Sequence, residues 1–138
     1  MLKLFLSSHG HLASGMKSSV QILTGNTDMI TVFDAYITQE SVEEKLDEFF
    51  AQVTDEDQVV LLSDLYGGSV NQVMMRYLDH PNTMLVAGVN LAIVLELAVR
   101  QSITESELNE IVEQSQTMLR VVKNGVATEE ADSQEDFF

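Results

Sequence analysis

The chain has 138 residues, of which 45% are hydrophobic, enough to fill the core of one domain but not of two. Its 22 acidic residues against 7 basic ones give a formal net charge of −15, so most of its surface repels nucleic-acid phosphates and anionic membranes. The lack of cysteine excludes disulfides, thiolate metal sites and cysteine nucleophiles, and it permits a reducing compartment. We therefore expect a cytoplasmic protein.

Four apolar runs of strand length recur along the chain without alternating with polar residues. Such runs are typical of parallel strands that are buried on both faces. Between them, apolar residues recur at every third or fourth position, which indicates helices. The predicted strands cover residues 2–6, 29–33, 59–62 and 84–89, and the predicted helices between them cover 12–23, 42–53 and 70–77.

Helical spacing continues after the fourth strand, in residues 91–100 and 108–122. Two helix starts are marked by capping boxes, Ser41 with Glu44 and Thr104 with Glu107. Residues 125–138 are acidic and have no period, which predicts a solvated tail. We therefore expect a single domain over residues 1–124.

The alternation of strands and helices predicts the three-layer α/β class, with a mainly parallel sheet covered by helices on both faces. The common flavodoxin-like strand order is 2-1-3-4. In that order the first and third strands are neighbours, and ligands bind beyond their carboxyl ends. The loops that follow the strands are therefore the places to search for a site.

A histidine and an aspartate follow the first and third predicted strands, at positions 9 and 64. If these strands are neighbours, His9 and Asp64 form a dyad. Asp64 would then accept a hydrogen bond from one ring nitrogen of His9, leave the other nitrogen as the nucleophile, and stabilise the cation that forms once this nitrogen is loaded.

The turn after Asp64 contains two glycines and a serine, Gly67, Gly68 and Ser69. Their amides and hydroxyl can converge on an anion near the dyad, and a phosphoryl group fits this description. The chain has no Gly-x-x-x-x-Gly-Lys-Ser/Thr loop, which disfavours ATP as the direct donor. Asn90, after the fourth strand, either lines the same site or caps the helix that follows it.

These segments resemble the mannose-type enzyme IIA proteins of the bacterial phosphoenolpyruvate-dependent sugar phosphotransferase system. The resemblance covers residues 2–124 and is carried by Ser8-His9-Gly10, by Asp64 to Ser69 and by Ala87 to Leu91. It implies that His9 takes a phosphoryl group from the histidine-containing phosphocarrier protein and passes it to the IIB component, which phosphorylates the sugar during uptake.

The resemblance also assigns roles to the remaining site residues. Asp64 would be the hydrogen-bond partner of His9, Ser69 and the amides of Gly67 and Gly68 would contact the phosphoryl oxygens, and Asn90 would be a wall of the site. The contact with the membrane components IIC and IID would be indirect, and we expect no cofactor and no metal.

This chain departs from the family pattern at two positions and leaves one segment ambiguous. The family usually has proline where this chain has Val70 and Ala92, so we expect a looser anion cradle that keeps all its polar groups. The resemblance further implies a homodimer in which an antiparallel C-terminal strand adds to the partner's sheet. Residues 118–122 are rich in β-formers, so they are either this strand or the end of the last predicted helix.

Three other functions compete with this interpretation. A receiver domain would be phosphorylated on Asp64 itself, although the acidic Mg²⁺ ligands it needs after the first strand are missing. A flavin-mononucleotide module would need aromatic flanks, for which only Tyr66 and Phe33 are available. A metal-dependent hydrolase would use His9, His11 and Asp64, whereas His11 otherwise is a surface residue at a helix entry.

Overall fold

The computed structural model, which describes residues 1–125, has a four-stranded parallel sheet with the strand order β2-β1-β3-β4. The predicted three-layer class and the predicted strand order are both confirmed. The elements follow in the order β1 (Leu2–His9), α1 (Leu12–Thr24), β2 (Ile30–Ala35), α2 (Val42–Phe50), β3 (Gln58–Ser63), α3 (Ser69–Met75), β4 (Thr83–Ala87), α4 (Leu91–Ala98) and α5 (Glu105–Gln116).

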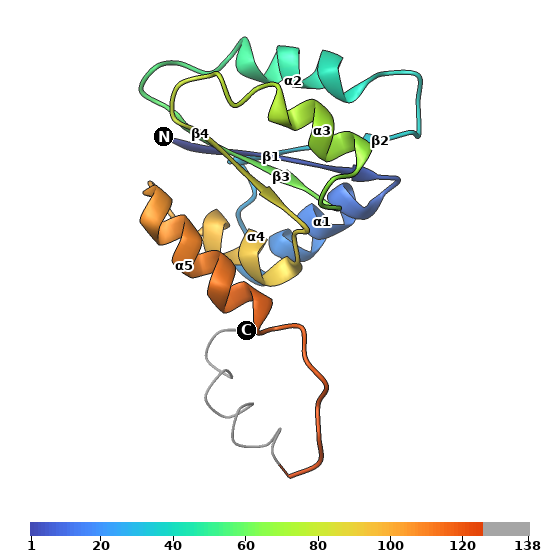
Figure 1. Ribbon diagram of the computed structural model, residues 1–138, viewed down its shortest axis with the longest axis vertical. Helices are drawn as coiled ribbons and strands as arrows, with labels where there is room; N and C mark the ends of the chain where they lie inside the picture. Colours follow the sequence, from blue (N-terminus) through green and yellow to red (C-terminus); the bar gives the residue numbers. More distant parts are fainter. Residues whose placement is uncertain (126–138) are drawn as a thin grey trace.

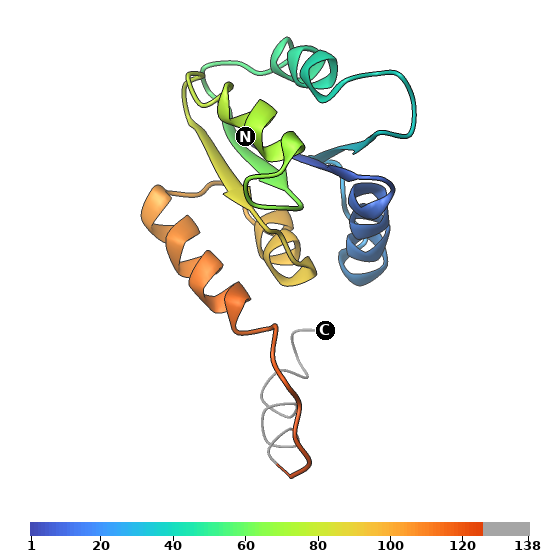
Figure 2. The same cartoon turned by 45° about the vertical axis from the view of Figure 1, so that its right-hand side comes forward.

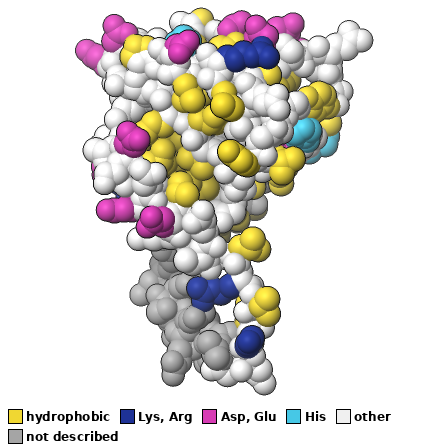
Figure 3. All heavy atoms as spheres, in the orientation of Figure 1, with side chains coloured by type: hydrophobic (Ala, Val, Ile, Leu, Met, Phe, Trp, Pro, Cys, Tyr) yellow, Lys and Arg dark blue, Asp and Glu magenta, His cyan; other side chains and the backbone are white. Residues whose placement is uncertain are grey.

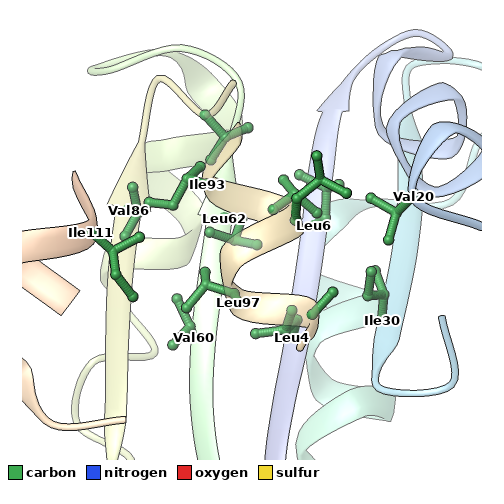
Figure 4. Close-up of a cluster of buried hydrophobic side chains, with 14 of the residues drawn as sticks. Leu4, Leu6, Val20, Ile30, Val60, Leu62, Val86, Ile93, Leu97 and Ile111 are labelled. Carbon is green, nitrogen blue, oxygen red and sulfur yellow. The ribbon is translucent and has the colours of Figure 1, made fainter. Parts of the chain in front are cut away.

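The helices cover both faces of the sheet, as Figure 1 shows, with α2 and α3 on one face and α1, α4 and α5 on the other. Alternate residues of β1 point to opposite faces, so Leu4 and Leu6 pack against α1 and α4, while Phe5 packs against α2 and α3. Figure 4 shows the larger core, in which Leu97 of α4 lies over Leu4 and the neighbouring strand residues. Each of these four side chains is fully buried.

β1 extends three residues beyond its predicted end at Leu6. Ser7 and Ser8 interrupted the apolar pattern, but both are buried and both hydroxyls are satisfied. The Ser7 hydroxyl donates to the carbonyl of Phe33, at 2.7 Å, and the Ser8 hydroxyl accepts the backbone N–H of Ala13, also at 2.7 Å. Because their polar groups have partners, these serines can continue the strand. His9 is consequently the last residue of β1 and pairs with Ala35 of β2.

α5 begins and ends earlier than predicted. Both predicted capping boxes are present, and the box of Thr104 and Glu107 begins α5 at Glu105, before the predicted start at residue 108. The helix ends at Gln116, so the prediction of a helix continuing to residue 122 is wrong. Most of the stability of a helix in a protein comes from packing its apolar face. Ser115 is buried, whereas every residue from 116 to 125 is exposed, so this packing stops there.

Residues 118–122 are neither helix nor strand in this single chain. Leu119 and Val121 are 88% and 84% exposed, and Figure 2 shows the segment after α5 leaving the body of the molecule. β4 lies at the edge of the sheet, with no strand from residues 1–125 on its outer side. The predicted tail, residues 125–138, lies outside the described residues except for Gly125.

None of the helices in residues 1–125 combines the length and the apolar character that a membrane span requires.

Candidate functional site

The topology brings His9 and Asp64 together. β1 and β3 are neighbours, His9 ends β1, and Asp64 immediately follows β3. The Oδ2 atom of Asp64 lies 2.9 Å from the Nδ1 atom of His9 and also accepts the backbone N–H of His9, at 2.9 Å. One carboxylate oxygen therefore holds both the backbone and the ring of the histidine.

The electrostatics of this pair determine the tautomer of His9. Burial raises the pKa of Asp64, but the hydrogen bonds from the His9 backbone and ring outweigh burial and leave this pKa below its usual value. The carboxylate is therefore ionised at neutral pH and can only accept, so the Nδ1 atom of His9 carries the hydrogen. In the neutral form of the ring the Nε2 atom therefore keeps its lone pair, and the His9 side chain is 44% exposed. This arrangement presents a nucleophilic nitrogen at the surface.

The second carboxylate oxygen of Asp64 indicates that the His9–Asp64 pair has a functional role and is not only a structural ion pair. This Oδ1 atom is buried and has no hydrogen-bond partner within residues 1–125. An unsatisfied buried oxygen costs free energy, and a native protein that retains one often does so at a functional position.

Two further side chains surround the Nε2 side of His9. The Ser69 hydroxyl lies 3.3 Å from Nε2, so the structure brings Ser69 to the dyad, while its predicted contact with phosphoryl oxygens stays a prediction. The Tyr36 ring stacks on the His9 ring, with 5.3 Å between the ring centroids, and the Tyr36 hydroxyl lies 2.5 Å from that of Ser69. Sequence reasoning missed Tyr36. It directly follows β2, so the rule that directed attention to the loops after strands would have found it.

The glycine turn before α3 is built differently from the predicted cradle. Gly67 has a φ of +76°, a left-handed conformation that glycine adopts without strain. The N–H of Gly68 donates to the carbonyl of Leu65, at 3.1 Å, so this amide is engaged inside the turn. α3 begins at Ser69 although Val70 stands where the resemblance implies a proline, and Val70 is buried. The turn therefore presents the Ser69 hydroxyl to His9.

Asn90 holds two helices. Its Oδ1 atom accepts the backbone N–H of Ile93 and caps α4, and its Nδ2 atom donates to the carbonyl of Ser115 at the end of α5, at 2.7 Å. The sequence allowed Asn90 either to line the site or to cap the helix that follows it, and these contacts show the helix cap. Both polar atoms of the Asn90 side chain therefore have partners away from His9.

A second histidine–aspartate pair lies at the start of α1. The Nδ1 atom of His11 is 3.0 Å from the Oδ2 atom of Asp34, which also accepts the hydroxyl of Ser14, at 2.6 Å. Burial raises the pKa of Asp34, but the hydrogen bonds from Ser14 and His11 outweigh it and lower this pKa below its usual value. The His11 side chain is 74% exposed and lies at the start of α1. The sequence predicted this surface position for His11 if it is not a metal ligand.

The arrangement of these residues bears on two of the competing functions. His11 pairs with Asp34 rather than Asp64, and residues 1–125 contain no group of three or more His, Asp and Glu side chains that could hold a metal ion. Phe33 is buried in the core, so it cannot flank a flavin at the ends of the strands.

Comparisons with known proteins agree with the fold and the motifs. The family model EIIA-man, described as PTS system fructose IIA component, matches residues 3–116. The PTS system fructose-specific EIIA component of Bacillus subtilis (strain 168) is 25% identical, over 99% of each chain. The PTS IIA protein associated with the fucose utilization operon of Streptococcus pneumoniae has a TM-score of 0.76 and 28% identity, over 91% of this chain and 96% of that one. The mannose/sorbose-specific IIA subunit of Enterococcus faecalis has a TM-score of 0.74 and 28% identity, over 88% and 94%.

Proposed function

This chain belongs to the EIIA-man family of sugar phosphotransferase system components, and we propose that His9 is the residue on which it carries a phosphoryl group. Family membership assigns it a role in sugar phosphotransfer. The observation that supports His9 is its double hydrogen bond to Asp64, which places the ring hydrogen of the neutral imidazole on Nδ1 and leaves Nε2 as the free nitrogen of a half-exposed side chain at the carboxyl end of the sheet.

The transfer proceeds by direct displacement at phosphorus. The lone pair on Nε2 attacks the phosphorus of a phosphorylated donor, an Nε2–P bond forms, and the donor's bond to phosphorus breaks with its electron pair returning to the donor. No proton has to leave His9, because Nδ1 already donates to Asp64. The ring gains positive charge as the new bond forms, and the carboxylate 2.9 Å from Nδ1 stabilises this charge.

The proposed donor is the histidine-containing phosphocarrier protein and the proposed acceptor is the IIB component, with the membrane components IIC and IID involved only through IIB. The transfer takes place in the cytoplasm in this proposal. The formal net charge of −15 supports attraction of a basic donor surface. Leu65, Tyr66 and Ile37, which follow β3 and β2 at the same edge as His9, are exposed and give that edge apolar contact area.

A homodimer with exchanged C-terminal strands forms part of the same proposal. The segment 118–122 supports it, since its residues are exposed and rich in β-formers, and such a segment can add to the edge of another sheet. The edge of β4 offers the place. A groove of about 420 Å³ beside β4 is lined by Leu85, Leu78 and Val112 among others, and Figure 3 shows hydrophobic side chains gathered on this face.

The test is to incubate the purified chain with labelled phosphoenolpyruvate, enzyme I and the phosphocarrier protein, and to compare two variants. His9→Ala should accept no label, while His11→Ala, which removes the other aspartate-paired histidine, should accept label as the unmodified chain does. The label should be lost in acid and kept in alkali. A His9→Ala variant that is still fully labelled contradicts the proposal, and an alkali-labile label that disappears in Asp64→Ala establishes the receiver-type alternative.

A further inference from the structure

We propose that Tyr36 is a positioning residue for phosphoryl transfer, which aligns the His9 ring by stacking and orients the Ser69 hydroxyl on Nε2. This inference rests on the proposed function of His9 and adds a group that the motifs of the sequence did not contain. It is carried by the contact chain Tyr36, Ser69, His9, Asp64, in which each side chain touches the next.

The two histidine–aspartate pairs of the chain show what Tyr36 adds. In both pairs a carboxylate Oδ2 atom lies about 3 Å from Nδ1, at 2.9 Å in the His9 pair and 3.0 Å in the His11 pair. A carboxylate on Nδ1 is therefore not what distinguishes His9. Within residues 1–125, His9 is the one of the two that has a hydroxyl near Nε2 and an aromatic ring against its face, and these contacts come from Ser69 and Tyr36.

The hydrogen bonds have a single consistent direction. Asp64 can only accept, so His9 donates from Nδ1 and its Nε2 atom accepts. The Ser69 hydroxyl must then donate its one hydrogen to Nε2, across 3.3 Å, and the Tyr36 hydroxyl must donate to the Ser69 oxygen. Without the Tyr36 hydroxyl, Ser69 would be free to rotate away. With it, Ser69 stays beside Nε2, and when Nε2 gives up this hydrogen bond to attack phosphorus, the Ser69 hydroxyl is in place to donate to an oxygen of the phosphoryl group.

The conformation of Tyr36 itself indicates a function. Its φ is +67°, a left-handed conformation that is uncommon for residues other than glycine, asparagine and aspartate and that strains the backbone. Tyr36 is 65% exposed, so burial of its side chain contributes little free energy to offset that strain. Tyrosine is suited to this position because its ring contacts His9 and its hydroxyl contacts Ser69.

The kinetic test compares Tyr36→Phe with Ser69→Ala and with the double variant. Tyr36→Phe keeps the ring and removes the hydroxyl, so single-turnover phosphorylation at saturating donor should slow about five-fold, the effect of one hydrogen bond. The KM for the donor should not change. Because Tyr36 acts through Ser69, the double variant should be no slower than Ser69→Ala alone. Tyr77→Phe, at a tyrosine whose hydroxyl donates to Glu43 and Asp47 and makes no contact with Ser69, is the matched control and should leave the rate unchanged.

A spectroscopic readout separates positioning from stability. Side-chain ¹H–¹⁵N NMR spectra of the unphosphorylated protein report the tautomer and the Nε2 hydrogen bond of each histidine. Tyr36→Phe should shift the Nε2 resonance of His9 and leave that of His11, which serves as an internal reference in the same spectrum. This measurement does not depend on phosphoryl transfer.

The outcomes of these experiments distinguish failure of the Tyr36 inference from failure of the proposed function of His9. If His9→Ala still accepts label, the proposed function fails, whatever Tyr36 does. If His9 is the labelled residue but Tyr36→Phe changes only the KM, Tyr36 contacts the donor and the positioning role is overturned. Rate losses that add up in the double variant, or an unmoved Nε2 resonance of His9, overturn it as well.

Discussion

Replacing Asp64 with asparagine removes the negative charge beside His9 and keeps a side chain of nearly the same shape. The charge that builds up on the ring during transfer then loses a carboxylate 2.9 Å from Nδ1. Coulomb's law at this distance gives about 1.4 kcal/mol at the dielectric constant of water and about 6 kcal/mol at an effective value of 20. The His9 side chain is 44% exposed, so the value lies between these limits.

We take the stabilisation of the transition state that Asp64→Asn removes as about 2–3 kcal/mol, which corresponds to a decrease of roughly 30- to 150-fold in the transfer rate. The assay is rapid-quench phosphorylation of Asp64→Asn by the phosphorylated carrier protein at saturating donor, with binding of the unphosphorylated carrier measured separately and expected to persist. Asp34→Asn, in the other histidine–aspartate pair, is the matched control and should stay within about two-fold of the unmodified chain. A folded Asp64→Asn variant with an unchanged rate would refute the reasoning, because Asp64 would then be merely structural.

Further predictions concern pH, assembly and salt. The backbone N–H of Thr54 and then the ammonium of Lys3 lower the pKa of Asp57 from 3.8 to about 2, so its contribution to folding is complete above roughly pH 4 and is lost as the pH falls toward 2. Urea unfolding at several pH values should show this loss, and Asp57→Asn should abolish that part of the pH dependence; an unchanged profile contradicts the assignment. Leu119→Glu should convert the proposed dimer to a monomer in sedimentation experiments, whereas Ile22→Glu, at a similarly exposed residue of α1, should not; a monomeric unmodified chain contradicts strand exchange. The rate of association with the donor should fall as ionic strength rises, and a salt-independent rate contradicts electrostatic attraction.

The order of the strands could be predicted because strands buried on both faces leave unbroken apolar runs, and because few topologies connect such strands by helices. The dyad followed from that order, since it makes the ends of β1 and β3 neighbours. The exact end of β1 could not be predicted in this way. Ser7 and Ser8 are polar in the sequence, and only the tertiary structure supplies the Phe33 carbonyl and the Ala13 amide that satisfy them.

Three features of the site depend on contacts between distant parts of the chain. Tyr36 has a left-handed backbone conformation that no local pattern indicates. It follows β2, and its ring stacks on His9 at the end of the neighbouring strand β1. Asn90 belongs to a motif, but its contact with Ser115 depends on how α5 packs. The end of α5 is likewise set by packing, since the helical period continues beyond Gln116 while the buried surface does not.

The most direct test of the central claim identifies the ring nitrogen that carries phosphorus. The phosphorylated protein, labelled with ¹⁵N in its histidines, is examined by ³¹P and ¹⁵N NMR. Because Nδ1 of His9 donates to Asp64, the account predicts phosphorus on Nε2 of His9 and a retained hydrogen on Nδ1. Phosphorus on Nδ1, on His11 or on a carboxylate would contradict it.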